Sequence, residues 1–203
     1  MAAEQKRQEV ADQRRRWKKA IAEVEPSRLV FLDESAAKTN MTRLYGRAPR
    51  GQRVIEHAPA GHWCTTTMVG ALRHDRIETP LVIEGAMDSV VFQGYVEQML
   101  APTLRAGDVV VRDNLAPHKT QGVQKAIEAV GATVRYLPPY SPDFHPIESM
   151  WSKVKQHLRS AAARTHDGLV RAVGSALRSV TPTDCHGFFQ GYGYIGTQKV
   201  RML

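Results

Sequence analysis

Three acidic residues stand where the sequence favours catalytic carboxylates: Asp33, Asp113 and Glu148. Asp33 ends the apolar run RLVFLD and Asp113 ends the β-branched run DVVVRD, so each is expected at the end of a buried strand. Glu148 follows the proline-rich segment PPYSPDFHP and is expected near the start of a helix. Carboxylates from two neighbouring strands and one helix can meet at one edge of a sheet.

Three converging carboxylates repel one another unless cations neutralise them. Mg²⁺, with Mn²⁺ as a substitute, is the hard cation that suits oxygen ligands. Two ions about 3.5–4 Å apart activate the attacking oxygen and stabilise the leaving oxygen in a displacement at phosphorus. The sequence therefore predicts that Asp33, Asp113 and Glu148 are both catalytic and metal-binding. Taken singly, each also fits a structural role at the end of a strand, in a turn or at a helix N-terminus.

Other polar residues compete with these three or support them. Glu34 would point to the opposite face of a strand from Asp33, which favours a structural or supporting role. Asp143 lies in the proline-rich turn, where Asp commonly bonds its own backbone, so Glu148 is the preferred third carboxylate. Asn114 and His118 flank Asp113. We expect them to position water or phosphate without binding a metal directly, although a structural role fits them equally well.

Hydrophobic periodicity predicts the elements that must position these residues. Helices are expected at 3–22, 88–100, 119–130, 146–160 and 166–179, and strands at 28–33, 65–72, 79–84, 108–113 and 133–137. Residues 43–53 are expected to form a turn or hairpin tip. Strands come first and then alternate with helices, which indicates an α/β fold with a mixed sheet. In the helix that carries Glu148, a buried stripe is predicted from Ile147, Trp151, Val154 and Leu158, with Glu148 at its margin.

The charge distribution points to a polyanionic partner. The chain has 28 Lys and Arg against 20 Asp and Glu, a formal net charge of +8, concentrated in residues 1–20 and 148–178. Nucleic acid is the favoured partner, and solubility alone is the alternative. The predicted DNA contacts are Arg43, Arg47, Arg50, Arg53, His118, Lys119, Lys155 and Arg159, together with Arg14–Arg16, Lys18 and Lys19 of the N-terminal segment. Trp63 and Trp151 are expected in the core, and the segment GFFQGYGYIG is expected to pack on the domain surface.

Composition limits the cellular context. No apolar run approaches the roughly 18 residues that cross a bilayer, and the charged N-terminus has no signal-peptide core. Cys64 and Cys185 form no CxxC pair, so we expect reduced thiols and no zinc site. These features predict a cytoplasmic protein without a membrane partner.

Several sequence blocks resemble one family. FLDES, VVRDNLAPHK and LPPYSPDFHPIESMWSKVK are similar to the signature blocks of DDE transposases in the mariner-related superfamily, specifically its bacterial insertion-sequence branch. Asp113 and Glu148 are separated by 34 residues, the spacing of that superfamily. The resemblance implies a ribonuclease-H-like fold, a mixed central sheet flanked by helices. It also implies cut-and-paste transposition, in which water cleaves the element's end and the freed 3′-hydroxyl attacks target DNA, typically at TA.

The resemblance also implies partners and an organisation. Expected partners are transposon-end and target DNA and a second copy in a synaptic homodimer, with nucleoid association when DNA is bound. The expected division is a basic helical arm or linker at 1–25, the catalytic domain at 26–195 and a tail at 196–203. Full-length relatives carry a helix-turn-helix region that does not fit before Pro26. The chain is therefore expected to be a fragment, a partner of a separately encoded helix-turn-helix part, or a degraded copy.

One residue departs from the family pattern, and three other functions are compatible with parts of the sequence to different degrees. His145 stands where relatives have Asn, a better helix N-cap, which is expected to cost roughly 1 kcal/mol. Its alternative roles are a tolerated substitution or an approach to DNA phosphate. A decayed or domesticated transposase that binds DNA without cutting it remains the alternative function. An RNA-strand nuclease fits the blocks less well, and an aspartyl-phosphate phosphatase would need Asp where Ser35 stands.

Overall fold

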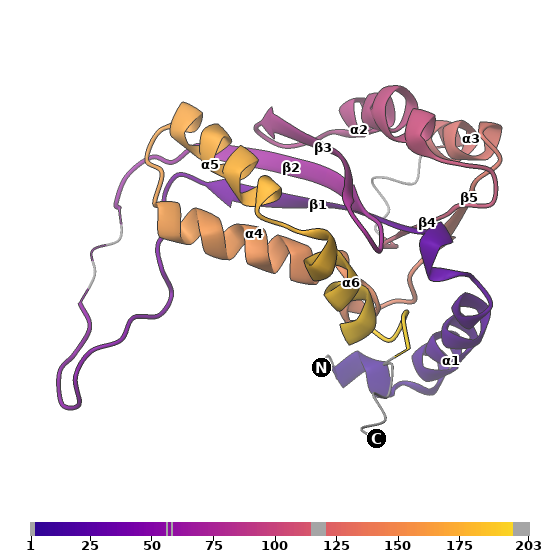
Figure 1. Ribbon diagram of the computed structural model, residues 1–203, viewed down its shortest axis with the longest axis horizontal. Coiled ribbons are helices and arrows are strands. Elements are labelled where there is room, and N and C mark those ends of the chain that lie inside the picture. The colour runs from indigo at the N-terminus through magenta and orange to yellow at the C-terminus, as the bar shows by residue number, and fades with distance from the viewer. Residues whose placement is uncertain (1–2, 56, 58, 115–120, 197–203) are drawn as a thin grey trace, which may run out of the picture.

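A mixed five-stranded sheet organises the chain (Figure 1). The computed structural model describes residues 3–55, 57, 59–114 and 121–196. The strand order is β3-β2-β1-β4-β5, with β1 antiparallel to β2, β2 antiparallel to β3, and both β1–β4 and β4–β5 parallel. The strands are β1 Leu29–Lys38, β2 Thr65–Leu72, β3 Ile77–Glu84, β4 Val109–Arg112 and β5 Thr133–Tyr136. The predicted α/β fold with a mixed sheet is confirmed.

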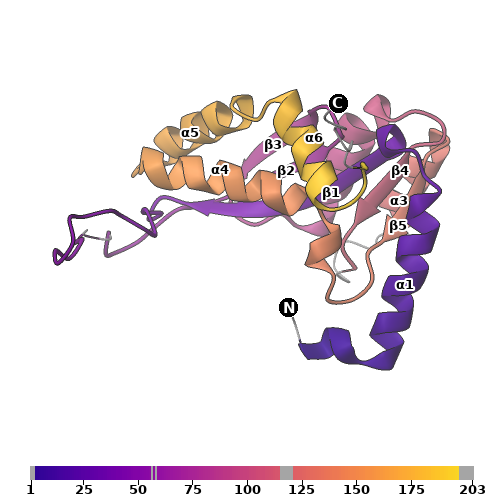
Figure 2. The ribbon, with the colours of Figure 1, turned by 60° about the horizontal axis from the view of Figure 1, so that its bottom comes forward.

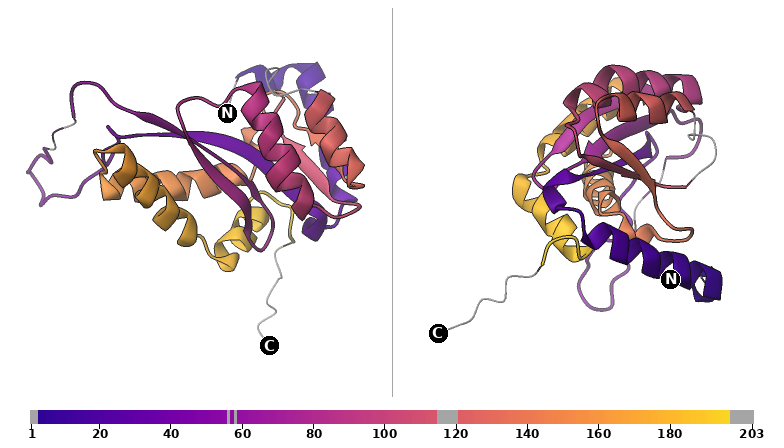
Figure 3. Two further views of the ribbon diagram at one scale, coloured as in Figure 1. Left: turned by 90° about the horizontal axis from the view of Figure 1, so that it is seen from above. Right: turned by 90° about the vertical axis from the view of Figure 1, so that its right-hand side faces the viewer.

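Helices cover both faces of this sheet (Figure 3). Their bounds are α1 Gln8–Ala22, α2 Ser89–Tyr95 continuing as a π-helix over Val96–Leu100, α3 Gln121–Ala129, α4 Ile147–Ala161, α5 His166–Arg178 and α6 Pro182–Gly191. One core cluster packs α2 and α3 against one face through residues such as Val30 and Val110. The other packs α1, α4, α5 and α6 against the opposite face through Phe31 and Val111. Alternate residues of β1 and β4 thus serve different cores, as the pleat requires.

β1 is longer than the sequence predicted. The strand was expected to end at Asp33, but it continues to Lys38 because β2 pairs with it as far as Lys38↔Thr65. On the other side, β4 pairs only with Leu29, Val30 and Phe31. Asp33 therefore lies inside a strand, two residues beyond its last parallel partner, where the β4 side of β1 is open.

A long connection, residues 39–64, joins β1 to β2 and runs away from the body of the molecule (Figures 1 and 2). The turn expected within 43–53 is confirmed: the Gln52 N–H donates to the Pro49 carbonyl at 3.0 Å, and Gly51 has a φ of 86°. The expectation that Trp63 lies in the core is wrong. It is 51% exposed, in the part of this connection just before β2, whereas Trp151 is buried as expected.

Both ends of the described chain pack against the domain (Figure 2). The helix expected at 3–22 is interrupted at Arg7, whose backbone is extended: Ala3–Lys6 forms a 3-10 helix, and α1 begins at Gln8 and buries Val10, Trp17 and Ile21. The C-terminal segment packs as expected, but its helix α6 was not predicted. A capping box formed by Thr181 and Asp184 starts α6, with Pro182 at its first position, and Phe189 is fully buried.

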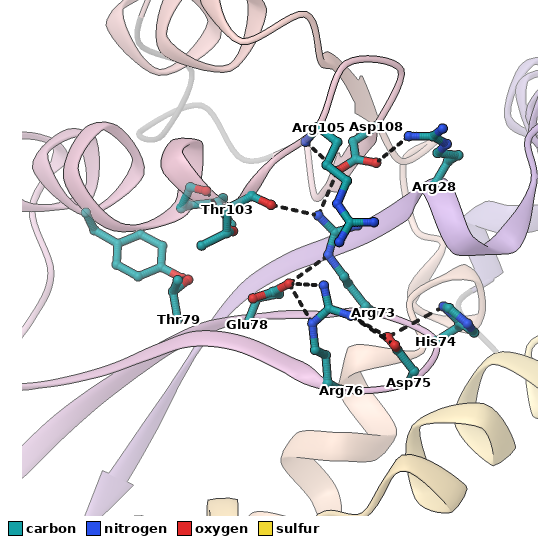
Figure 4. A network of polar contacts seen from close by, with 12 residues as sticks. Arg28, Arg73, His74, Asp75, Arg76, Glu78, Thr79, Thr103, Arg105 and Asp108 are labelled. Carbon is teal, nitrogen blue, oxygen red and sulfur yellow. Dashed lines mark hydrogen bonds and ion pairs between the residues drawn. The ribbon is translucent and has the colours of Figure 1, made fainter.

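A buried ion-pair network fixes the start of β4 (Figure 4). Arg73, just after β2, donates to Asp108 at 2.7 Å and to Glu78 of β3 at 2.9 Å. The Arg105 N–H also donates to Asp108, at 2.9 Å. Asp108 and Arg73 are both almost fully buried, so the network holds β4 in register with the β2–β3 hairpin. That register determines the position of the side chains at the C-terminal end of β4.

Candidate active site

Parallel pairing brings the two aspartates side by side. β1 and β4 pair in the register Leu29↔Val109 and Phe31↔Val111. Continued by two residues, the same register sets Asp33 level with Asp113, just past the end of β4. Because residues two apart share a face, both carboxylates lie on the face that Phe31 and Val111 present to α4.

Glu148 reaches the same place from α4. The buried stripe predicted for this helix is confirmed, since Ile147, Trp151, Val154 and Leu158 are all buried. Glu148 is exposed beside that stripe, in the first turn of the helix. Packing of the stripe on β1 thus brings a solvent-accessible carboxylate to the end of β4.

The three carboxylates line a shared cavity. Its volume is about 370 Å³, and its wall also includes Arg112 and Lys155. A second cavity of about 520 Å³ meets the same three carboxylates from the side of the proline-rich turn, and Asn114 lines it. The structure therefore brings Asp33, Asp113 and Glu148 together, with cationic side chains on one side and the turn on the other.

Burial and negative charge strongly perturb Asp33. Burial is the larger cause, followed by the charge of Glu148 and then that of Asp113, and together they raise the pKa of Asp33 to about 7. The site therefore disfavours three simultaneous negative charges unless a cation compensates them.

The rival carboxylates have other surroundings. Asp143 forms a bidentate ion pair with Arg14 of α1, at 2.9 and 2.5 Å, which holds the pKa of Asp143 below its usual value. Arg14 thus binds a protein carboxylate, unlike the phosphate contact expected for it. Glu34 follows Asp33 on the strand and lines the cavity of about 370 Å³. Its negative charge is a minor contribution to the raised pKa of Asp33.

The turn before α4 is held by both ends of the chain. Besides Asp143, Arg14 donates to the Ser141 hydroxyl at 2.7 Å, and its guanidinium lies 4.1 Å from the centre of the Phe144 ring. From the C-terminal side, the Tyr194 hydroxyl donates to the Phe144 carbonyl at 2.6 Å. These contacts fix the segment that leads directly into Glu148.

His145 is buried, so its ring does not reach out to a DNA phosphate in this conformation. Burial lowers the pKa of His145 to about 3, and its two ring nitrogens have no hydrogen-bond partner among the described residues. The ring packs 5.7 Å from that of Phe31. The expectation that His145 is the N-cap of α4 is wrong: Pro146 holds that position without a side-chain cap, and the Glu148 N–H donates to the His145 carbonyl at 3.0 Å.

The predicted DNA contacts lie on the connection between β1 and β2, on α4, and in a segment that the structure does not describe. Arg43, Arg47, Arg50 and Arg53 are exposed along the 39–64 connection. Arg43 and Arg159 line one cavity of about 400 Å³ together with other residues of that connection and of α4, and Arg159 lies one helical turn from Lys155 of the carboxylate cavity. His118 and Lys119 lie outside the residues that the structure describes.

Sequence reasoning missed Arg112. This side chain is buried in the wall of the carboxylate cavity, with its guanidinium 4.5 Å from the Phe92 ring centre. Burial lowers its pKa, and the charges of Tyr136, Asp113 and Glu34 oppose that effect. The available signal was a lone cation inside the apolar run DVVVRD, because a buried strand rarely carries an Arg without a specific role.

The donor set fits a hard divalent cation. Three carboxylates offer oxygen ligands alone, which Mg²⁺ and Mn²⁺ favour, and a cation would offset the repulsion felt by Asp33. Within the described part of the chain, no three His, Cys, Asp or Glu side chains are already gathered as a metal-binding cluster. The three carboxylates share the cavity without forming such a cluster.

A family model for DDE superfamily endonucleases matches residues 28–170, well over half of the chain. The chain belongs to the DDE superfamily endonuclease family. No curated protein sequence matches it. A bacterial insertion-sequence origin, as the sequence blocks suggested, stays a prediction.

Solved structures share the fold of this DDE endonuclease domain. The Mos1 transposase paired-end complex with a left transposon end matches with a TM-score of 0.72 at 13% identity, covering 95% of this chain and 60% of that one. The Mos1 strand transfer complex matches with a TM-score of 0.66 at 15% identity, covering 90% and 56%. The isolated Mos1 catalytic domain matches with a TM-score of 0.59 at 12% identity, covering 95% and 88%.

These matches confirm the predicted ribonuclease-H-like fold. The chain spans about 60% of the length of the first Mos1 transposase structure it matches. Among the described helices, none has the length and apolar character needed to cross a membrane.

Proposed function

We propose that this DDE endonuclease domain is the catalytic part of a transposase that cleaves DNA and joins its strands, with Asp33, Asp113 and Glu148 as the catalytic residues. The observation that carries the proposal is their convergence on one cavity from β1, the end of β4 and the start of α4. Family membership and the shared fold with Mos1 transposase support the same activity.

The three carboxylates would hold two Mg²⁺ or Mn²⁺ ions. When bound, such ions activate the attacking oxygen and stabilise the leaving oxygen at phosphorus. Mos1 structures have been solved with Mg and with Mn, which supports the choice of metal. Asp33 would bind the ions from β1, Asp113 from just past the end of β4 and Glu148 from the exposed side of α4, and closure of these side chains onto the ions is part of the proposal.

Basic residues around the site would bind the DNA backbone. Lys155 lies in the wall of the carboxylate cavity, and Arg43 and Arg159 lie beside it, so a strand that places a phosphate at the carboxylates would pass them in turn. Arg47, Arg50 and Arg53 extend this basic surface along the exposed connection. Asn114 would orient water or phosphate beside Asp113, and His118 and Lys119 stay predictions of the same kind.

The wider organisation is also proposed. Residues 1–25 form a basic arm, 26–195 the catalytic domain and 196–203 a tail. The partners are transposon-end and target DNA, a second copy of the chain, and a helix-turn-helix part encoded separately. The complexes of Mos1 transposase with transposon ends support the DNA partner. A cytoplasmic location, with nucleoid association when DNA is bound, is part of the same proposal.

Nicking of supercoiled plasmid DNA tests the catalytic proposal. We expect the wild type to nick DNA only with Mg²⁺ or Mn²⁺, and Asp113→Asn to slow nicking by at least about 100-fold because a metal ligand is lost. Calorimetric Mn²⁺ binding should weaken in the same variant. Asp167→Asn is the matched control, since that carboxylate is exposed at the start of α5.

Equal nicking by the wild type and Asp113→Asn would reject the mechanism. Absence of nicking by both, with DNA binding preserved, would favour the alternative of a decayed or domesticated transposase that binds DNA without catalysis.

A further inference from the structure

Tyr140 has a strained backbone at the mouth of the site. Its φ is 55°, in the left-handed region that residues with a Cβ rarely adopt. Such strain persists only where the surroundings impose it, and it concentrates at functional sites. Here the surroundings do impose it: Gln5 donates to the Tyr140 carbonyl at 2.5 Å, and the Ser141 hydroxyl, which is held by Arg14, donates to the Pro139 carbonyl at 3.0 Å.

The strained turn leaves a large aromatic residue in contact with solvent. Tyr140 is 49% exposed and lines the cavity of about 520 Å³ that meets the three carboxylates. Beside it, the wall is formed by Leu137, Pro138 and Pro139, whose side chains are apolar. The larger cavity therefore presents an exposed aromatic ring and apolar side chains next to the carboxylates, a combination that can accept a flat, partly apolar ligand.

The two cavities at the carboxylates differ in chemistry. The smaller one has Arg112 and Lys155 in its wall, which suits a phosphate. The larger one has proline rings and Tyr140, which suits the flat face of a nucleobase. A nucleotide strand offers both groups at a fixed separation along its backbone.

We propose that Tyr140 is a base-binding residue, which stacks on the nucleobase next to the phosphate held at the carboxylates. The inference rests on the proposed DNA-cleaving function and adds a contact to it. Stacking tolerates any base, so Tyr140 would hold the strand in place without selecting a sequence. The arm contributes indirectly, because Gln5 and Arg14 hold the turn that presents the ring.

A base-specific fluorescence probe tests this contact. The probe is a DNA duplex with a short single-stranded 3′ overhang that carries 2-aminopurine, whose fluorescence falls when it stacks on an aromatic ring. Binding is measured with Ca²⁺, which takes carboxylate oxygens without the strict octahedral geometry of Mg²⁺. Tyr140→Phe keeps a ring, Tyr140→Leu keeps only apolar bulk, and Val170→Ala is the control because Val170 is an exposed apolar residue of α5 that lines neither the carboxylate cavities nor the cavity of Arg43 and Arg159.

The expected results distinguish the effect of an aromatic ring at position 140 from the effect of an apolar side chain of similar size. The wild type, Tyr140→Phe and Val170→Ala quench the probe, whereas Tyr140→Leu does not and binds the DNA about 5- to 100-fold more weakly. Tyr140→Asn, which suits a left-handed backbone, should also lose quenching while its melting temperature is unchanged or higher.

Four outcomes would overturn the proposal. Quenching by Tyr140→Leu equal to that of the wild type would do so, as would an equal loss of quenching in Val170→Ala. A large fall in the melting temperature of Tyr140→Asn would make the ring a structural element. These three reject the stacking contact alone if the wild type still nicks DNA, whereas failure of the wild type to bind any DNA rejects the proposed function as well.

Discussion

Replacing Asp33 by Asn should stabilise the metal-free chain at alkaline pH and remove most of the stabilisation that divalent cations give. Asp33 lies near Asp113 and Glu148 in the wall of the cavity. Burial and the negative charges of these two neighbours raise the pKa of Asp33 to about 7. An amide of the same shape carries no charge, so the substitution removes the repulsion while leaving the packing nearly unchanged.

The magnitude follows from the raised pKa. A rise from 3.8 to about 7 corresponds to about 4 kcal/mol of unfavourable free energy for ionised Asp33, and about 2 kcal/mol if water in the cavity screens the charge. A folded-state pKa above the unfolded value means no penalty below pH 3.8, a growing penalty as the pH rises, and the full penalty above about pH 7. Asp33→Asn should therefore gain about 2–4 kcal/mol at about pH 8 and almost nothing at about pH 4.

Divalent cations should offset much of this stability difference between the two proteins. Binding to the folded state alone stabilises it by about 2.7 kcal/mol at a cation concentration of 100 times the dissociation constant. We expect the wild type to show this gain at about pH 8, and Asp33→Asn to show a much smaller one because a ligand is missing. The gain of the wild type should shrink toward pH 5, where protons compete for Asp33.

Urea unfolding followed by far-ultraviolet circular dichroism measures both effects, with chelator or with Mg²⁺, at a series of pH values. His145 has an opposite pH dependence, but it is present in both proteins and cancels in their difference. Asp167→Asn serves as the control, with an exposed carboxylate whose loss should change stability by less than about 0.5 kcal/mol. A pH-independent difference between wild type and Asp33→Asn, or an equal Mg²⁺ response in both, would refute the reasoning.

Three further predictions concern the framework of the site. Asp108→Asn should lower the free energy of unfolding by about 1.5–3 kcal/mol in urea titrations, because the buried Arg73 guanidinium loses its charged bond to Asp108 and keeps only Glu78 as a carboxylate partner among the described residues, whereas the exposed Asp75→Asn should cost less than about 0.5 kcal/mol. His145→Asn should reduce acid sensitivity: the pKa of His145 is lowered from 6.5 to about 3, so the wild type loses stability as the pH falls below 6.5, and the variant should be relatively more stable by about 3 kcal/mol at about pH 4. An unchanged acid profile would count against this. For Arg14 and Asp143, which are partly exposed, a double-mutant cycle to Ala should give a coupling free energy of about 0.5–1 kcal/mol, and a value near zero would mean that the arm does not hold the turn.

Local sequence patterns determined much of the site. The spacing of Ile147, Trp151, Val154 and Leu158 identified the buried stripe of α4 and left Glu148 at its exposed margin. The run that ends at Asp113 identified β4 within one residue at each end. These features depend on helix periodicity and on β-branched runs, which a short window of sequence contains.

Tertiary structure decided what depends on distant partners. Asp33 lies in the middle of β1 because β2 pairs with β1 over more residues than β4 does. Asp33 and Asp113 lie side by side because two segments about 80 residues apart in the sequence pair as parallel strands. Arg14 binds Asp143 across 129 residues of sequence, and Trp63 remains outside the core because no element covers it.

The raised pKa of Asp33 likewise needs the folded chain, since it comes from burial and from charges that only folding brings near. The sequence by itself thus determined which residues have the right chemistry and which elements carry them. Their convergence, charge state and support were fixed by long-range packing, because the free energy of those contacts depends on distances that no local pattern encodes.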